Sequence, residues 1–111
     1  MKKAIFTLQH NETYYLPIWC KWYRETFAPE DMYILAHNPS IEMVKMCERA
    51  RDDGFNVKYL FTDVIFDHNW LNSIVHGKQR ELLEKYDYVM YTDCDELVAP
   101  DNMTLSEFID T

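Results

Sequence analysis

Short apolar runs that are rich in β-branched and aromatic residues alternate with longer amphipathic segments along this chain. The apolar runs predict four short strands, over residues 4–8, 32–36, 56–61 and 88–92. Between them, apolar residues recur every three or four positions, which predicts helices over residues 13–27, 40–53 and 73–85. The last strand shows no polar alternation, which is typical of a strand that is covered on both faces.

Residue types that begin or end helices support these boundaries. Ser40 is expected to cap the second helix, and Gly54 stands where a glycine commonly follows a helix. Thr104 and Glu107 have the spacing of a capping box, so a short last helix is predicted after them. Residues 63–72 show no clear period, and Gly77 is expected to delay the start of the third helix.

The predicted order is strand, helix, strand, helix, strand, helix, strand, then a loop and a last helix. This alternation predicts an α/β fold with an open, mostly parallel, doubly wound sheet of Rossmann-like type and helices on both faces. The chain has 111 residues and shows no repeat or linker. We therefore expect a single domain over residues 1–111.

Charge and cysteine content narrow the class of protein. The net charge of −8 argues against a nucleic-acid partner or an anionic membrane surface, because both need clustered cations. Cys20, Cys47 and Cys94 are odd in number and lack metal-site spacing, so free thiols and a cytoplasmic location are expected. No apolar stretch approaches the ~20 residues that a transmembrane segment needs.

Polar residues follow each predicted strand, and ligands bind beyond the carboxyl ends of strands in such sheets. The strongest candidate is the acidic run that comes directly after residues 88–92, Asp93-Cys94-Asp95-Glu96. Two carboxylates this close repel each other unless a cation is bound, and Mg²⁺ and Mn²⁺ prefer carboxylate oxygens and substrate phosphates. The alternative is that these acids only solvate a strand end or cap the next element.

Two further groups allow both a structural and a functional interpretation. His10, Asn11 and Glu12 follow the first strand, where they can cap the first helix, contact a ligand, or do both. Lys78 and Arg80 stand near the expected start of the third helix, either on a solvated face or in contact with a phosphate. The sequence contains no dinucleotide fingerprint, P-loop or nucleophile elbow.

Three segments together carry a family resemblance: TLQHNETYYLPIWCKWY, a strand ending in HNP, and KQRELLEKYDYVMYTDCDELVAPD. They resemble the glycosyltransferase family 2-like proteins of the GT-A fold over nearly the whole chain. The resemblance implies a nucleotide-diphospho-sugar donor, Mn²⁺ or Mg²⁺, and hexosyl transfer to an unknown glycan, lipid or protein acceptor. It implies that Asp95 holds the metal and that Asp93 contacts the metal or the ribose.

The resemblance also implies further donor contacts. The base and ribose pocket would be lined by Thr7, His10, Asn11 and Glu12. Asn38 lies where many relatives carry a base-binding Asp, and Lys78 and Arg80 are candidates near the diphosphate. In the family, the catalytic base and the acceptor site come from a second half that is not in this sequence. We therefore expect a donor-binding half that transfers little or no sugar by itself, and a homodimer or a complementing chain.

Three other classes of protein compete with this interpretation. A haloacid-dehalogenase-like phosphoryl-transfer module also uses a strand that ends in DxD, but there the motif normally opens the domain. A receiver-like domain would need an acidic pair after the first strand, where this chain has His10-Asn11-Glu12. A non-catalytic interaction domain would use the exposed edge of the sheet to bind a partner.

Overall fold

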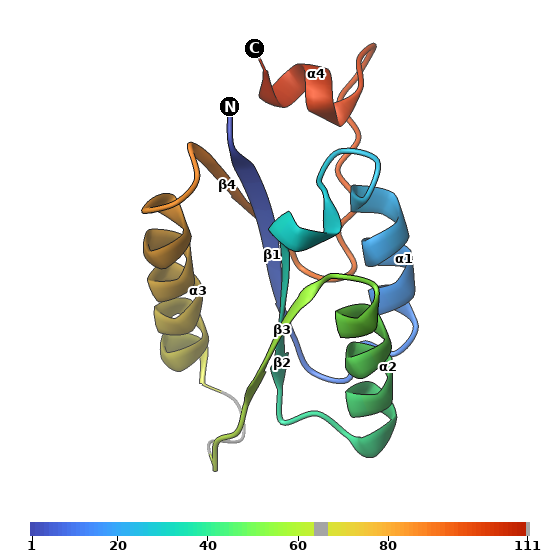
Figure 1. The fold of residues 1–111 in the computed structure, drawn as a ribbon. Helices are drawn as coiled ribbons and strands as arrows, with labels where there is room; N and C mark the ends of the chain where they lie inside the picture. The colour runs from blue at the N-terminus through green and yellow to red at the C-terminus, as the bar shows by residue number, and fades with distance from the viewer. Residues whose placement is uncertain (64–66, 111) are drawn as a thin grey trace.

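A four-stranded sheet lies at the centre of the computed structural model, which describes residues 1–63 and 67–110. Its strands are β1 (Lys3–Gln9), β2 (Met32–His37), β3 (Asn56–Leu60) and β4 (Tyr88–Tyr91). All neighbouring strands are parallel, and their order in space is β3-β2-β1-β4 (Figure 1). The predicted parallel α/β sheet is confirmed.

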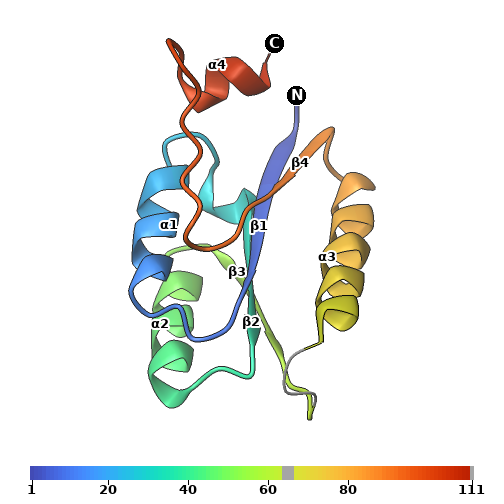
Figure 2. The ribbon, with the colours of Figure 1, turned by 180° about the vertical axis from the view of Figure 1, so that it is seen from behind.

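Helices cover both faces of the sheet. On one face lie α1 (Tyr15–Tyr23) and α2 (Ile41–Asp52), and on the other lies α3 (His68–Leu83), as Figures 1 and 2 show. A single 3₁₀ turn (Pro29–Asp31) leads into β2. The short α4 (Leu105–Ile109) lies beyond the amino ends of the strands, on the same side as the N-terminus. This arrangement confirms the doubly wound architecture.

Several predicted helix boundaries are confirmed by capping contacts. The hydroxyl of Ser40 accepts a hydrogen bond from the backbone N–H of Met43 at 3.2 Å. Gly54 follows α2 with a φ of 100°, a left-handed conformation that favours glycine. Thr104 and Glu107 form both hydrogen bonds of the capping box before α4.

Two helices differ from their predicted ranges. The first ends at Tyr23 and not at residue 27, because the chain turns there: the N–H of Phe27 donates to the carbonyl of Tyr23. The third begins at His68, five residues before the predicted start. Asp67 caps it by accepting the N–H of Asn69 at 2.9 Å. Gly77 lies inside this helix and does not delay its start, so that prediction was wrong. An added Cβ at Gly77 would meet no atom within 4 Å.

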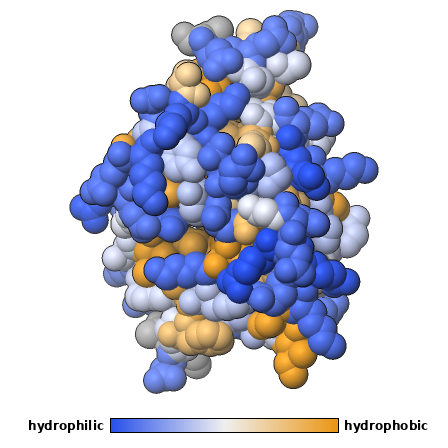
Figure 3. All heavy atoms as spheres, viewed as in Figure 1, coloured by the Kyte–Doolittle hydropathy of each residue, from blue (hydrophilic) through white to orange (hydrophobic). Residues whose placement is uncertain are grey.

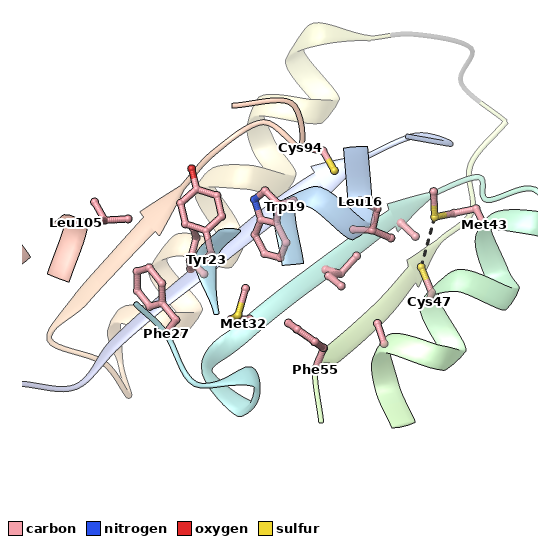
Figure 4. Close-up of a cluster of buried hydrophobic side chains, with 14 of the residues drawn as sticks. Leu16, Trp19, Tyr23, Phe27, Met32, Met43, Cys47, Phe55, Cys94 and Leu105 are labelled. Carbon is pink, nitrogen blue, oxygen red and sulfur yellow. Dashed lines mark hydrogen bonds between the residues drawn. The ribbon is translucent and has the colours of Figure 1, made fainter. Parts of the chain in front are cut away.

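The apolar core consists of two layers, one on each face of the sheet. The larger layer packs beneath α1 and α2 and includes Trp19, Tyr23, Met32 and Met43 (Figure 4). The smaller layer, beneath α3, is built around Phe6, Leu35 and Leu82. Because successive side chains of a strand point to opposite faces, the apolar residues of β1 and β2 serve both layers.

The outer surface is mostly polar, with smaller apolar patches between the polar side chains on the face drawn in Figure 3. All three cysteines are free thiols. Among the helices of the described residues, none combines the length and the apolar character that crossing a bilayer requires.

Candidate functional site

The strand order locates a topological switch point between β1 and β4. From β1 the chain proceeds outward to β2 and β3, and it then crosses to the opposite side of β1 to form β4. In open parallel sheets, ligands bind beyond the carboxyl ends of the two strands at this point. Here β4 ends at Tyr91, which pairs with Phe6, whereas β1 continues to Gln9. The segment after β4 therefore leaves the sheet beside the last residues of β1.

The acidic segment after β4 folds into a tight turn with an alternating orientation of side chains. Cys94 is only 3% exposed and belongs to the core layer under α1, whereas Asp93 and Asp95 are exposed. Two hydrogen bonds hold Asp93. The phenol of Tyr91 donates to the carboxylate of Asp93 at 3.0 Å, and the backbone N–H of Asp93 donates to the carboxylate of Glu96 at 2.7 Å. A buried thiol thus anchors the turn and leaves two carboxylates directed at solvent.

Two aromatic residues of α1 hold this turn in place. The indole N–H of Trp19 donates to the hydroxyl of Thr92 at 2.9 Å. The phenol of Tyr23 donates to the carbonyl of Glu96 at 2.7 Å and accepts the N–H of Val98 at 3.0 Å. The sequence predicted the helix that carries these aromatic side chains, but not their contacts with the turn. Trp19 and Tyr23 are four positions apart, so the indole N–H and the phenol lie on the same face of the helix. This spacing was the signal that could have revealed their hydrogen bonds to another segment.

The segment after β1 is held by backbone and side-chain contacts of its own. Asn11 adopts a left-handed conformation with a φ of 54°, and its side-chain oxygen accepts the N–H of Ser40 at 2.8 Å. The N–H of Glu12 donates to the side-chain oxygen of Gln9 at 3.0 Å. His10 contacts the carbonyl of His37 through Nδ1 at 2.7 Å. These contacts are structural, and none of them among the described residues uses the carboxylate of the half-buried Glu12.

The segment after β1 and the turn after β4 both affect the pKa of the buried Cys94 thiol. Burial raises the pKa of Cys94, and the carboxylates of Glu12 and Asp95 raise it further. Both carboxylates are therefore near Cys94, one from the end of β1 and the other from the turn after β4. The structure brings together two acidic motifs that are about 80 positions apart in the sequence.

Three buried polar atoms near the same edge lack a hydrogen-bond partner among the described residues: Thr7 Oγ1, Gln9 Nε2 and His37 Nε2. An unpaired buried polar group costs about 1–3 kcal/mol, so such atoms commonly mark places where a water or a ligand binds. Thr7 was a predicted site residue, whereas Gln9 and His37 were not.

His37 lies between two other rings on the α3 side of the sheet. Its centroid is 5.6 Å from that of His10 and 4.9 Å from that of Trp70. Burial lowers the pKa of His37, and the neighbouring His10 lowers it further. Both effects favour the neutral form of this ring at the edge of the sheet.

Asn38 has a structural task. Its φ is 42°, and its side-chain amide makes two hydrogen bonds with the backbone of Thr62, at 3.0 and 2.9 Å. These bonds tie the end of β2 to the segment after β3. The amide predicted to contact the donor is therefore already engaged within the protein.

Lys78 and Arg80 are not at the carboxyl edge, which corrects the predicted placement of these cations beside a helix N-terminus. Helix α3 begins at His68, so Lys78 lies about 15 Å further along its axis. Its ammonium is 3.4 Å from the carboxylate of Glu81 and 5.1 Å from the ring centroid of Tyr33, in the first half of β2. Arg80 lies in the last turn of the helix.

The chemistry of the carboxylates limits the kind of metal site that they can form. Within residues 1–63 and 67–110, no three His, Cys, Asp or Glu side chains gather as the full ligand set of a metal. Asp93 and Asp95 can supply two oxygens and leave the remaining positions to a substrate. Mg²⁺ and Mn²⁺ commonly bind in this way, through one or two carboxylates and substrate phosphates. The residues fit a cation shared with a ligand.

Neither the models of known protein families nor the curated protein sequences match this chain. The functional argument therefore rests on the fold and on the chemistry of the carboxyl edge.

Proposed function

We propose that this chain binds a nucleotide-diphospho-sugar and a divalent cation at the carboxyl edge of β1 and β4, as the donor domain of a glycosyltransferase. One observation carries the proposal: at the switch point of the sheet, Asp93 and Asp95 are exposed on either side of the buried Cys94. The resemblance of the HNE and DCDE segments to the glycosyltransferase family 2-like proteins supports the same function.

Electrostatics explains why a cation is needed. The acidic residues Glu12, Asp93, Asp95 and Glu96 would repel a diphosphate in a chain whose net charge is already −8. Asp93 and Asp95 would hold the cation. When bound, the cation neutralises the diphosphate and stabilises the leaving nucleotide as the bond to the sugar breaks.

The surrounding residues have roles that follow from their contacts. Tyr91 and Glu96 orient Asp93, and Trp19 and Tyr23 hold the turn against α1. Thr7 Oγ1 and Gln9 Nε2 are buried and have no hydrogen-bond partner among the described residues, so each can still bond to a water or a ligand group that reaches this end of β1. Lys78 and Arg80 are not needed for the diphosphate in this proposal, since the cation supplies the positive charge.

The test is calorimetric titration of the chain with UDP-, GDP- and dTDP-linked sugars in Mn²⁺. We expect one of these ligands to bind, and the heat of binding to vanish with excess EDTA or in the variant Asp95→Asn. The matched control is Asp101→Asn, which removes an exposed carboxylate from the same segment after β4 and should leave binding unchanged. Binding that is equal in Asp95→Asn and the wild type, or no binding to any of the three, contradicts the proposal.

A non-catalytic binding domain is the second candidate, and the β4 edge of the sheet favours it, whereas the β3 edge is protected against strand addition. On the β3 edge, Lys58 is exposed and the guanidinium of Arg51 donates to the carbonyl of Val57. The β4 edge has the uncharged sequence YVMY, so among the described residues no charged side chain of the strand itself opposes the addition of another strand. Sedimentation velocity over a range of concentrations tests this: a rising mass supports edge pairing, and a constant monomer mass contradicts self-association.

A further inference from the structure

A groove of about 700 Å³ lies between α1 and α2. Its volume is in the range of small-molecule sites. Buried apolar side chains, among them Leu16, Ala50 and Phe55, form its floor. It is lined by none of the residues assigned to the candidate site, which lies at the carboxyl edge of β1 and β4. The groove therefore needs an explanation of its own.

The charged residues of this groove lie toward one of its ends. Leu16 and Pro17 lie in the first turn of α1, and Met46 lies in the middle of α2. Lys21 and Arg49 lie in the last turns of the same two helices, and Arg24 is the C-cap residue of α1. The three cations thus lie toward one end of the groove, together with Ala50, Asp53 and Phe55, whereas the lining residues toward the other end are uncharged.

The basic end is unusual for this chain. Lys21, Arg24 and Arg49 line the groove with only one carboxylate, that of Asp53, although the chain as a whole has a net charge of −8. The guanidinium of Arg24 lies over the ring of Phe55, 5.8 Å from its centroid. No ion pair within 4.0 Å involves any of the three cations in the part of the chain that the structure describes. By contrast, Lys78 and Arg51 pair with acids on their own helices.

Helix dipoles account for only part of this arrangement. A cation in the last turn of a helix is favourable, which explains Lys21 and Arg49 individually. It does not explain why the cations of two different helices, together with Arg24, gather at one end of one apolar groove. Charge complementarity points to an anionic group at that end and an apolar group at the other.

We propose that this groove binds a single-chain anionic amphiphile, a medium-chain carboxylate, with its head at Lys21, Arg24 and Arg49 and its chain along Leu16, Pro17 and Met46. A bound helix fits less well. The nine residues of α1 span only about 14 Å, and a helical partner would call for charges along the rims and not at one end.

The experiment is a titration of the ¹⁵N-labelled chain with sodium decanoate below its micelle concentration, followed by amide chemical shifts. We expect saturable binding at one site, with the shifts centred on α1 and α2. The double variant Arg24→Gln/Arg49→Gln should bind at least about tenfold more weakly, because it loses charge-assisted contacts. Met46→Asn should also weaken binding, through the apolar end.

Matched controls separate this site from general adsorption of amphiphiles. Lys45→Gln removes an exposed cation of α2 that does not line the groove, and it should leave decanoate binding unchanged. Decyltrimethylammonium has the same tail and the opposite charge, and butyrate has the same head and a short tail. Both should bind at least about tenfold more weakly than decanoate. Thermal melts of each variant verify that the chain is folded.

Four outcomes overturn the proposal. These are equal binding of decanoate and decyltrimethylammonium, unchanged affinity of the Arg24→Gln/Arg49→Gln variant, chemical shifts centred outside α1 and α2, and binding of the chain to anionic vesicles but not to decanoate. The last result would identify the groove as a membrane-surface contact. None of these outcomes depends on nucleotide binding, so the groove and the carboxyl-edge site are tested independently.

Discussion

The indole nitrogen of Trp19 and the hydroxyl oxygen of Thr92 lie 2.9 Å apart in a hydrogen bond that joins residues 73 positions apart in the chain. Both side chains are buried, with exposures of 0% and 2%. The N–H of Thr92 also donates to the carbonyl of Phe6 at 3.3 Å. Thr92 therefore connects α1, β1 and the acidic turn, and the position of Asp93 depends on this connection.

Replacing Trp19 with Phe should lower the free energy of unfolding by about 1–3 kcal/mol, because the buried hydroxyl of Thr92 loses its donor. The matched control is Trp22→Phe. The indole of Trp22 also donates a hydrogen bond, to the carbonyl of Val98 at 3.1 Å, but the side chain is 42% exposed. Its loss should cost less than about 1 kcal/mol. Urea unfolding measures both, and equal losses would contradict the assigned role of Trp19.

Replacing Asn38 with Ala should destabilise the chain by more than the same change at Asn102. Both residues have a positive φ, of 42° and 61°, so both substitutions carry a similar backbone cost. Asn38 also loses two side-chain hydrogen bonds, both to Thr62, whereas the side chain of Asn102 makes none among the described residues. The difference should be about 1–3 kcal/mol in urea unfolding. No difference between the two variants would mean that the clamp between β2 and β3 contributes nothing.

His37 should make the protein less stable in mild acid. Burial and the nearby His10 hold its pKa below the usual value, so the unfolded chain takes up a proton at a higher pH than the folded chain does. Its contribution to stability should therefore fall as the pH drops through about 6.5, the ordinary value for histidine. In His37→Gln this part of the pH dependence should disappear, whereas it should remain in His76→Gln, which changes an exposed histidine. Unfolding curves between pH 5 and pH 8 make the comparison.

The thiols should react slowly in the folded protein. Burial raises the pKa of Cys20 to about 12 and that of Cys47 to about 11, and burial also raises the pKa of Cys94. The thiolate is the reactive form, so little of it is present at neutral pH. Ellman's reagent should label the folded chain far more slowly than the chain in urea. Rapid labelling of Cys47 or Cys94 in the folded chain would contradict this prediction.

The two cations of α3 should not matter for nucleotide binding. Lys78→Gln should leave the affinity for a nucleotide-sugar in Mn²⁺ unchanged, because its ammonium lies over Tyr33 and next to Glu81. By contrast, His10→Ala should weaken binding by about tenfold, since it changes the segment beside the acidic turn. Calorimetric titration of the two variants tests this. Weaker binding in Lys78→Gln would mean that the ligand extends along α3, away from the proposed site.

The sequence by itself determined the features that depend on near neighbours in the chain. The periods of apolar residues predicted four strands and the helices between them, and Ser40, Gly54 and Thr104 marked helix ends correctly. Two helix boundaries differ from those that the sequence predicted, the end of α1 and the start of α3. Helix α3 begins at His68 because Asp67 caps its first turn, in which the ring of Trp70 lies 4.9 Å from that of His37, measured between centroids. The chain turns after Tyr23 to reach β2.

Only the tertiary structure decided which candidate residues are available for chemistry. Residue type did not distinguish Asn38, whose amide is used by Thr62, from Thr7, whose hydroxyl has no partner among the described residues. Nor did it place Lys78 far along α3 or turn Cys94 inward between two exposed carboxylates. Periodicity is a property of successive residues. Hydrogen-bond partners and burial arise from segments that meet only when β1 and β4 are paired. The paired residues, such as Phe6 and Tyr91, are 85 positions apart in the chain, so a long loop must close before these contacts form.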